Sequence, residues 1–208
     1  MAAPRTRLNA EERREQILEA ATDVFGAVGY AAGTTDAIAR AAGISQAYVV
    51  RTFGSKEALL LAVVTRACDR VASAFREAIA SFSPLDTPDQ KAAHMGGAFT
   101  RLIADRGLML ALMHAFAQGH DPQIGPVARE GFLRIYRIVR YEAGLGEMEA
   151  MRFMAHGMLI DVLLALRLQD SDDHDARQLV AKALNMKVDH LHTLRGVVGN
   201  PGEFSARR

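Results

Sequence analysis

The fold class that we predict for this chain of 208 residues is all-α, on three observations. Apolar residues recur at helical spacing in nearly every periodic segment. The alternation of apolar and polar residues that is typical of strands never lasts for more than a few residues. Residues that favour helix starts and stops, such as Asn, Ser, Thr and Gly, stand between the periodic segments. The sequence therefore predicts helices joined by capped turns.

Composition limits the class of protein further. Hydrophobic residues make up 50% of the chain and charged residues 24%, which suits one large core, or one core with a small satellite domain. The start of the chain lacks an apolar signal segment, and the longest uncharged run, 107–120, has the length of a buried helix. We therefore expect a cytoplasmic protein with no membrane partner. The single cysteine, Cys68, is expected to be a small buried hydrophobe, with a redox sensor as the alternative.

The first helix is expected over about residues 10–28. Asn9 followed by Glu12 has the form of a capping box, in which each residue bonds the backbone of the other. An apolar stripe at helical spacing begins at Ile17 and stops near Gly29. These signals predict both ends of the helix.

Two short helices are expected next. Thr34 and Thr35 are placed to cap the first of them, and Gly43 is placed to end it in the left-handed conformation. Ser45 is placed to cap the second, which is expected to continue to about Thr52. Each helix is thus bounded by residues that favour its start or its stop.

The second short helix is expected to have two different faces. Val49 and Phe53, one turn apart, point toward the core, so that Gln46 and Arg51 point away from it. Two short helices joined by a turn with glycine form a helix-turn-helix, and a second helix of this size is narrow enough to enter a major groove. The net charge of the chain is only +1, but segment 38–56 has three basic residues and no acidic one.

Four motifs lie in this part of the chain: R-x-x-I-L-x-A-A from Arg14, F-x-x-x-G-Y from Phe25, a T-T…I-A-x-x-A-G-I-S segment from Thr34, and F-x-S-K-E-x-L from Phe53. Over about residues 14–60 the chain resembles the TetR family of bacterial regulators. The spacing from the threonines to Ile38 differs by one residue from the family pattern. The resemblance implies an N-terminal three-helix DNA-binding domain followed by a helical regulatory domain.

The resemblance implies DNA contacts of two kinds. Thr34 and Thr35 match a helix start that contacts phosphate, and Lys56 matches a lysine that holds a phosphate. Plain capping by the threonines and a solvated lysine are the alternative interpretations. Gln46 and Ala47 match positions that read bases, and a glutamine can pair with adenine through two hydrogen bonds.

One position departs from the family pattern. The family has a tyrosine near the end of the second short helix that contacts the DNA backbone, and Val50 stands there in this sequence. We expect Tyr48 or Arg51 to supply the missing phosphate contact. The residues expected at the DNA are Thr34, Thr35, Ser45, Gln46, Ala47, Tyr48, Arg51 and Lys56.

Beyond the matched segment only residue patterns apply. We expect a helix-turn-helix DNA-binding domain over residues 1–54 and a helical domain over residues 55–208, for which the family resemblance implies ligand binding and dimerisation. The apolar faces of the second part exceed what one monomer can cover, which predicts a homodimer, and in the family the final helix pair forms a four-helix dimer interface. The helices are expected over about residues 55–81, 88–105, 107–118, 122–143, 147–169 and 172–194, with a frayed tail after them.

The second part is rich in methionines and aromatic residues. These suit an ordinary core, which we favour for any single one of them, or an adaptable apolar pocket, which the family resemblance implies. Such a lining lacks an arginine cluster, so it suits a small apolar or aromatic effector better than a sugar phosphate. The expected ligand-binding residues are Phe99, Met109, Met113, Phe116, Phe132, Tyr136, Phe153, Met154 and His156, the tyrosine and the histidine supplying polar groups.

Catalysis, metals and cofactors are not expected. The sequence has no zinc-hydrolase, serine-hydrolase or phosphate-loop motif, and His190 and His192 would face different sides of a helix. An all-helical enzyme is the rival class, but it leaves the helix-turn-helix unexplained. We therefore expect a homodimeric transcriptional regulator that binds a palindromic operator in double-stranded DNA. Following the family, it is expected to be a repressor released by a small apolar ligand; a regulator without a ligand is the alternative.

Overall fold

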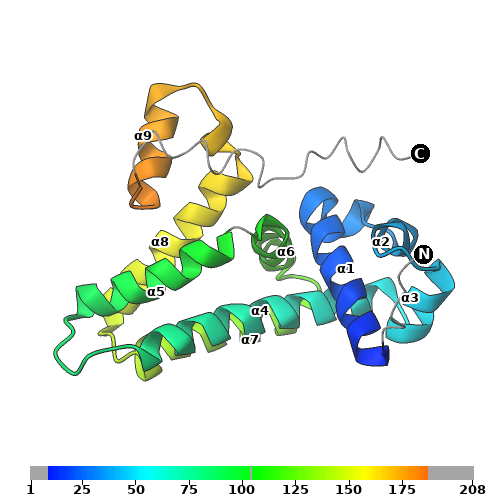
Figure 1. Ribbon diagram of the computed structural model, residues 1–208, viewed down its shortest axis with the longest axis horizontal. Helices are drawn as coiled ribbons and strands as arrows, with labels where there is room; N and C mark the ends of the chain where they lie inside the picture. Colours follow the sequence, from blue (N-terminus) through cyan, green and yellow to red (C-terminus); the bar gives the residue numbers. More distant parts are fainter. Residues whose placement is uncertain (1–8, 104, 187–208) are drawn as a thin grey trace, which may run out of the picture.

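The computed structural model describes residues 9–103 and 105–186, and over these ranges the chain forms helices and turns without a strand. The all-α prediction is confirmed. Figure 1 shows α1, α2 and α3 gathered at one end of the molecule and the long α4 running away from them. The helices are α1 (Ala10–Ala32), α2 (Thr35–Ala41), α3 (Gln46–Phe53), α4 (Lys56–Ala80), α5 (Pro88–Ile103), α6 (Arg106–Ala117), α7 (Ile124–Arg137), α8 (Glu147–Ala165) and α9 (His174–Ala183).

Local signals set the start and the bend of α1. Asn9 Oδ1 accepts the Glu12 N–H at 2.8 Å, and the Glu12 carboxylate accepts the Asn9 N–H at 2.7 Å, so the predicted capping box is formed. Gly29 has a φ of 73°, a conformation that glycine adopts without strain, and it bends the chain. The predicted helix end is therefore the position of a kink, and one further turn continues to Ala32.

The turn between α2 and α3 is fixed by backbone hydrogen bonds. Gly43 has a φ of 64°, the left-handed conformation predicted for it. The Ile44 N–H donates to Ala39 O at 3.0 Å, which closes the end of α2 in the manner of a Schellman motif. From α1, Gln16 Nε2 donates to Ala42 O at 2.9 Å. Because the carbonyls at the end of α2 are satisfied in this way, the angle between the two short helices is held.

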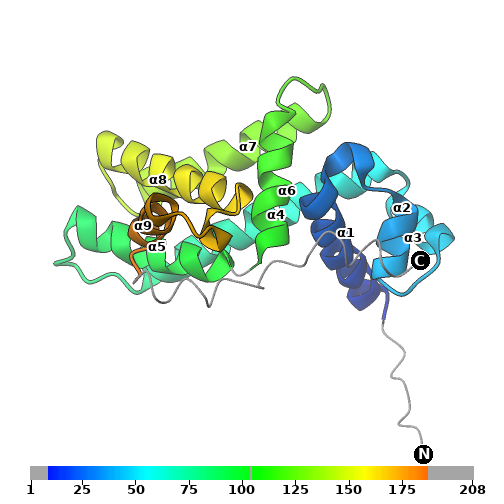
Figure 2. The same ribbon diagram turned by 90° about the horizontal axis from the view of Figure 1, so that it is seen from above.

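One hydrophobic core extends through both parts of the chain. It includes Ile17 of α1, Leu59 and Val63 of α4, and Ala150 of α8. Helix α4 packs on α1 and α3 of the first part and on α5, α6 and α7 of the second. A smaller cluster joins α8 to α9, and Figure 2 shows α5, α8 and α9 together at the end far from α1, α2 and α3. The boundary at residue 54 stays a prediction, since the core is continuous across it.

Two helices of the second part differ from their predicted spans in how they end. After α7, the chain continues as a π-helical turn, Ile138–Glu142, and Gly144 follows with a φ of 68°. Helix α8 ends at Ala165 instead of continuing to residue 169. The cause is Arg167, whose φ of 57° lies in the left-handed region and is incompatible with a continued helix.

The prediction for the final helix was also too long. Helix α9 is capped by Asp173, whose Oδ1 accepts the Ala176 N–H at 2.9 Å. It ends at Ala183, and Asn185 follows with a φ of 51°, which asparagine tolerates better than most residues. The rest of the predicted span, 187–194, lies outside the described residues, as do His190 and His192.

Two further expectations concern single features. Cys68 is buried on α4 against Gly131 of α7, as predicted. Burial raises the pKa of the Cys68 thiol to about 11, which keeps it protonated and argues against redox sensing. None of the helices within residues 9–103 and 105–186 is long and apolar enough to cross a membrane.

Candidate functional site

Helix α3 has the two faces that its sequence predicts. Val49 is completely buried and Phe53 partly buried, and both pack against the core. Gln46, Ala47 and Arg51 are exposed. The outer face of the helix therefore carries side chains that can reach a partner while the inner face holds the helix in place.

The start of α3 is tied to the start of α2. Ser45 Oγ accepts the Tyr48 N–H at 3.3 Å and so caps α3, as Thr34 Oγ1 caps α2 by accepting the Ala37 N–H at 3.1 Å. Gln46 Nε2 donates to Thr35 Oγ1 at 2.9 Å. The residue matched to base reading is thus bonded to a residue matched to phosphate binding. Thr34 is exposed and Thr35 half-buried, so the hydroxyl groups lie at the surface beside α3.

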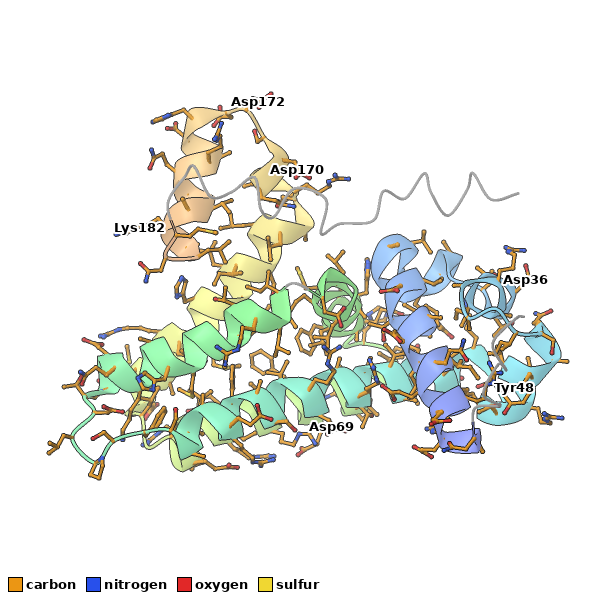
Figure 3. The ribbon with its side chains drawn as sticks, in the orientation of Figure 1. Asp36, Tyr48, Asp69, Asp170, Asp172 and Lys182 are labelled. Carbon is orange, nitrogen blue, oxygen red and sulfur yellow. The ribbon has the colours of Figure 1, made fainter. Side chains whose placement is uncertain are left out.

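Tyr48, labelled in Figure 3, pairs with Arg51 on α3. The guanidinium of Arg51 lies 4.7 Å from the centre of the Tyr48 ring, a cation–π contact. Val50, where the family has its tyrosine, is exposed and apolar. The ring of Tyr48 therefore positions the charge of Arg51, which follows Val50 directly on the same helix.

Lys56 has partners inside the protein. Its Nζ donates to Tyr30 O at 2.9 Å and to Ala31 O at 3.4 Å, and it lies 4.4 Å from the centre of the Tyr30 ring. Lys56 is the first residue of α4, so its ammonium ties the start of α4 to the last turn of α1. An ammonium has three N–H donors, so one remains for a phosphate. The sequence could not reveal this role, because the bonded residues are 26 and 25 positions away.

A cavity of about 720 Å³ lies in the second part of the chain, between α4, α5, α6, α7, α8 and the end of α9. Small residues of α5, including Gly96 and Gly97, leave space along one wall, since a Cβ added to either would meet nothing within 4 Å. The predicted ligand-binding residues that line the cavity are Phe99, Met109, Phe116, Phe132, Phe153, Met154 and His156.

The other two predicted residues, Met113 and Tyr136, do not line the cavity. On the same helices Leu112 and Ile135, each one position earlier, do so instead. One residue turns a helical side chain by about 100°, which is enough to move it from the cavity wall into the surrounding core. The periodic pattern gave the helices that form the wall but not the rotation of each one.

Asp161 also lines the cavity but was not among the predicted residues. It lines the cavity from α8, is only 9% exposed, and its Oδ1 is buried without a hydrogen-bond partner among the described residues. Burial raises the pKa of its carboxyl to about 7. The available signal was a lone acid in the apolar run 158–165, because such an acid must either be paired or be functional.

Helix α6 joins the cavity to the first helices. Met109, Leu112 and Phe116 line the cavity, and the same helix packs on α1. The contact is close at two glycines, since a Cβ on Gly26 of α1 would come within 2.6 Å of the backbone oxygen of Gly107 in α6. A shift of α6 away from its place must therefore also shift α1.

Helix α8 has an uncovered apolar stripe. Met148, Met151, Leu159, Val162 and Leu166 recur at helical spacing, and each is about two-fifths to two-thirds exposed. Ala155, which is also exposed, lies between them on the same face. Leu179 on the adjacent α9 is 46% exposed. A continuous stripe of this kind is typical of a surface that packs against another chain.

Comparison with known proteins gives a family for the first part of the chain. Residues 17–63 match the profile described as "Bacterial regulatory proteins, tetR family". Over 73 residues the chain is 44% identical to the HTH-type transcriptional activator FasR of Mycolicibacterium smegmatis. This match covers 35% of the chain and 33% of FasR, so the chain spans about a third of the length of this curated relative.

Solved structures share the fold over nearly the whole chain. A TetR-like transcriptional regulator from Rhodococcus sp. RHA1 has a TM-score of 0.59 at 21% identity, covering 93% of this chain and 100% of its own. The fatty acid degradation regulator FadR from Bacillus halodurans has a TM-score of 0.60 at 18% identity, covering 89% and 98%. Salmonella enterica GusR has a TM-score of 0.60 at 19% identity, covering 93% and 98%.

Proposed function

Through its N-terminal domain the chain belongs to the TetR family of bacterial regulatory proteins, and from this premise we propose that it is a homodimeric transcriptional regulator controlled by a small molecule. In this proposal it binds double-stranded DNA through α3, and it binds the effector in the cavity that α6 helps to line. In this proposal it works in the cytoplasm, without catalysis, metal or cofactor.

The observation that carries this function is the two-faced α3. A recognition helix must be held from behind and must present polar side chains in front, and buried Val49 and exposed Gln46 meet these two needs. Thr34 and Thr35 lie beside its start, Lys56 follows its end at the start of α4, and together they offer hydroxyl and ammonium groups to phosphates. Arg51, stacked on Tyr48, supplies the backbone contact in place of the residue at Val50.

The apolar stripe of α8 supports the homodimer. A twofold pair of chains would bury the stripe against its copy and would present two α3 helices to adjacent major grooves, about 34 Å apart. A palindromic operator follows from that symmetry. The division of the chain at residue 54 into a DNA-binding and a regulatory domain belongs to the same proposal.

The effector acts through α6 and α4. A molecule in the cavity touches Met109 and Leu112, and α6 passes its displacement to α1 at the contact of Gly26 with Gly107. Two ion pairs tie the same helices, Arg66 of α4 with Glu15 of α1, and Arg70 of α4 with Asp105 at the start of α6. The effector lowers DNA affinity only to the extent that it prefers the conformation that does not bind DNA.

Selection of bound duplexes from a random pool, followed by titration of the selected duplex, tests the function. We expect a palindromic site and binding that weakens steeply with salt. A control duplex with scrambled half-sites should bind far more weakly. Recovery of no enriched sequence would contradict the proposal.

A transcriptional activator is the second candidate, because the relative that is 44% identical over 73 residues is called an activator. Repression and activation differ in where the site lies relative to the promoter, not in the fold. Transcription from a promoter carrying the selected site decides between them. We expect output to fall when the protein is added, and a rise in output would favour the activator.

A further inference from the structure

Asp161, on the cavity wall, is a buried acid whose Oδ1 has no hydrogen-bond partner among the described residues. Its side chain is 9% exposed. An oxygen removed from water and left unbonded raises the free energy of the folded protein. Most of this desolvation has occurred before any ligand arrives. A ligand that brings an N–H donor to the carboxyl would form a hydrogen bond at a small further cost in desolvation.

The charged groups that line the cavity as a whole are more acidic than basic, which disfavours an anionic ligand. Among the described residues that line the cavity, three are acidic, Asp89, Glu149 and Asp161, and one is a lysine or arginine, Arg152. His156 also lines it, but its Nε2 lies 2.9 Å from Ala183 O, where it can only donate, so that N–H is already used. A ligand carboxylate would thus meet more negative than positive groups.

The aromatic lining favours a ligand with a positive charge and an apolar body. Phe75 lies with Phe153 at a centroid distance of 5.4 Å and with Phe99 at 6.3 Å. Phe116 and Phe132 form an edge-to-face pair at 5.6 Å. All five rings line the cavity. The faces of aromatic rings carry partial negative charge, so they attract a cation as well as the apolar body that bears it.

We propose that the effector is a hydrophobic amine in its protonated form, held by an N–H···O hydrogen bond to the Asp161 carboxylate with its apolar body against the phenylalanine rings. This proposal rests on the proposed function, which makes the cavity the effector site. Burial raises the pKa of the Asp161 carboxyl to about 7, so near neutral pH the carboxyl gives up its proton readily when an ammonium group arrives.

Three probes of equal length separate amines from other apolar ligands: 4-phenylbutylamine, 4-phenylbutan-1-ol and 4-phenylbutyric acid. Their affinities for the full chain are measured by titration calorimetry at pH 7. We expect the amine to bind about tenfold or more tightly than the alcohol, because a hydrogen bond to a charged group is among the stronger ones, and the acid to bind most weakly.

Two variants locate the effect. Asp161→Asn keeps the shape of the side chain and should remove the preference for the amine while leaving the affinity for the alcohol within about twofold. Asp89→Asn is the matched control, because Asp89 is an exposed acid on the same cavity and its loss should leave the preference in place. Calorimetry in buffers of different ionisation enthalpy adds a second readout. The wild type should release protons when the amine binds, and Asp161→Asn should release fewer.

The proposal is overturned if the alcohol or the acid binds as tightly as the amine, if Asp161→Asn keeps the preference, or if none of the probes binds. The proposed function is tested separately, by titration of the selected DNA with and without the amine. An amine that binds through Asp161 but leaves DNA affinity unchanged supports the ligand class and contradicts control by this cavity.

Discussion

Gly26 of α1 and Gly107 of α6 lie backbone against backbone, so closely that a Cβ on Gly26 would come within 2.6 Å of Gly107 O and 2.8 Å of Gly107 Cα. Neither neighbour is a flexible side chain that could turn away. The helix that carries part of the cavity wall and the helix that supports the helix-turn-helix thus meet at this point through main-chain atoms. This contact makes the position of α1 depend on that of α6.

The first prediction is that Gly26→Ala forces α1 and α6 apart. Because backbone must move to admit the new methyl group, the free energy of unfolding should fall by about 1–3 kcal/mol, measured by urea denaturation. Gly97→Ala is the control, since a Cβ there meets nothing within 4 Å and should be neutral or stabilising by up to about 1 kcal/mol. Equal stabilities of the two variants would show that the helices are not in contact as described.

The second prediction concerns Lys56. Lys56→Ala should weaken binding to every duplex by a similar factor and reduce the slope of log affinity against log salt by about 1, as expected for one lost phosphate contact. It should also lower the stability of the chain, because Tyr30 O and Ala31 O lose their donor.

Lys91→Ala is a matched control for this variant. Lys91 Nζ donates to Ala143 O at 3.3 Å and lies over the Phe82 ring, so it has the same kind of partners at a distance from α3. We expect it to leave the salt slope unchanged. If Lys56→Ala also keeps the wild-type slope, Lys56 only stabilises the end of α1.

The third prediction separates base reading from phosphate binding. Gln46→Ala should relax the preference at one base pair of each half-site by about 1–3 kcal/mol and leave the salt slope unchanged. Thr35→Val removes the acceptor of the Gln46 side chain and the hydroxyl offered to phosphate, but keeps the amide free to read a base. Titrations against the selected duplex and its single-base variants measure both effects. A uniform loss over all duplexes in Gln46→Ala would contradict base reading.

The fourth prediction is a pH dependence caused by Asp161. Burial raises its pKa from 3.8 to about 7, so between these values the folded chain keeps a proton that the unfolded chain has lost. Stability must therefore fall as pH rises through this window. Asp161→Asn removes this dependence, and its gain in stability over the wild type should grow between pH 4 and pH 8 by on the order of 3–5 kcal/mol.

Urea denaturation at several pH values and one protein concentration measures this difference. Asp161→Leu serves as a second variant, because it packs differently but also lacks the titrating group. The two variants should show the same change with pH relative to the wild type. Curves that run parallel to the wild type would mean that the carboxyl is ionised in the folded chain.

The sequence predicted the parts of this protein that depend on neighbouring residues. Asn9 with Glu12, Gly43 and Ser45 act within a few positions of themselves, and their capping and turn geometry was confirmed. The ends of α8 and α9 were missed, because they depend on the left-handed conformations of Arg167 and Asn185, which many sequences could adopt.

The same distinction between features set by neighbouring residues and features set by distant ones applies to the candidate sites. The faces of α3 follow from residue spacing, whereas the partners of Lys56 lie at the far end of another helix. For the cavity, seven of the nine predicted side chains line it, but Asp161 was overlooked because its significance depends on what surrounds it in space.

The last prediction concerns the stripe on α8. If it is the dimer interface, the double variant Val162→Arg with Leu166→Arg places two charges in an apolar contact and leaves them without partners, which should prevent association. Light scattering at micromolar concentration should then give 22.6 kDa instead of about twice this mass for the wild type. DNA affinity should fall as well, because binding of one α3 no longer brings a second α3 to the adjacent groove.

Leu85→Arg is the control for this variant. Leu85 is 90% exposed in the connection between α4 and α5, so the substitution adds a charge away from the stripe. A double variant that remains dimeric would place the interface elsewhere, and a monomeric wild type would refute the dimer together with its docking to two grooves.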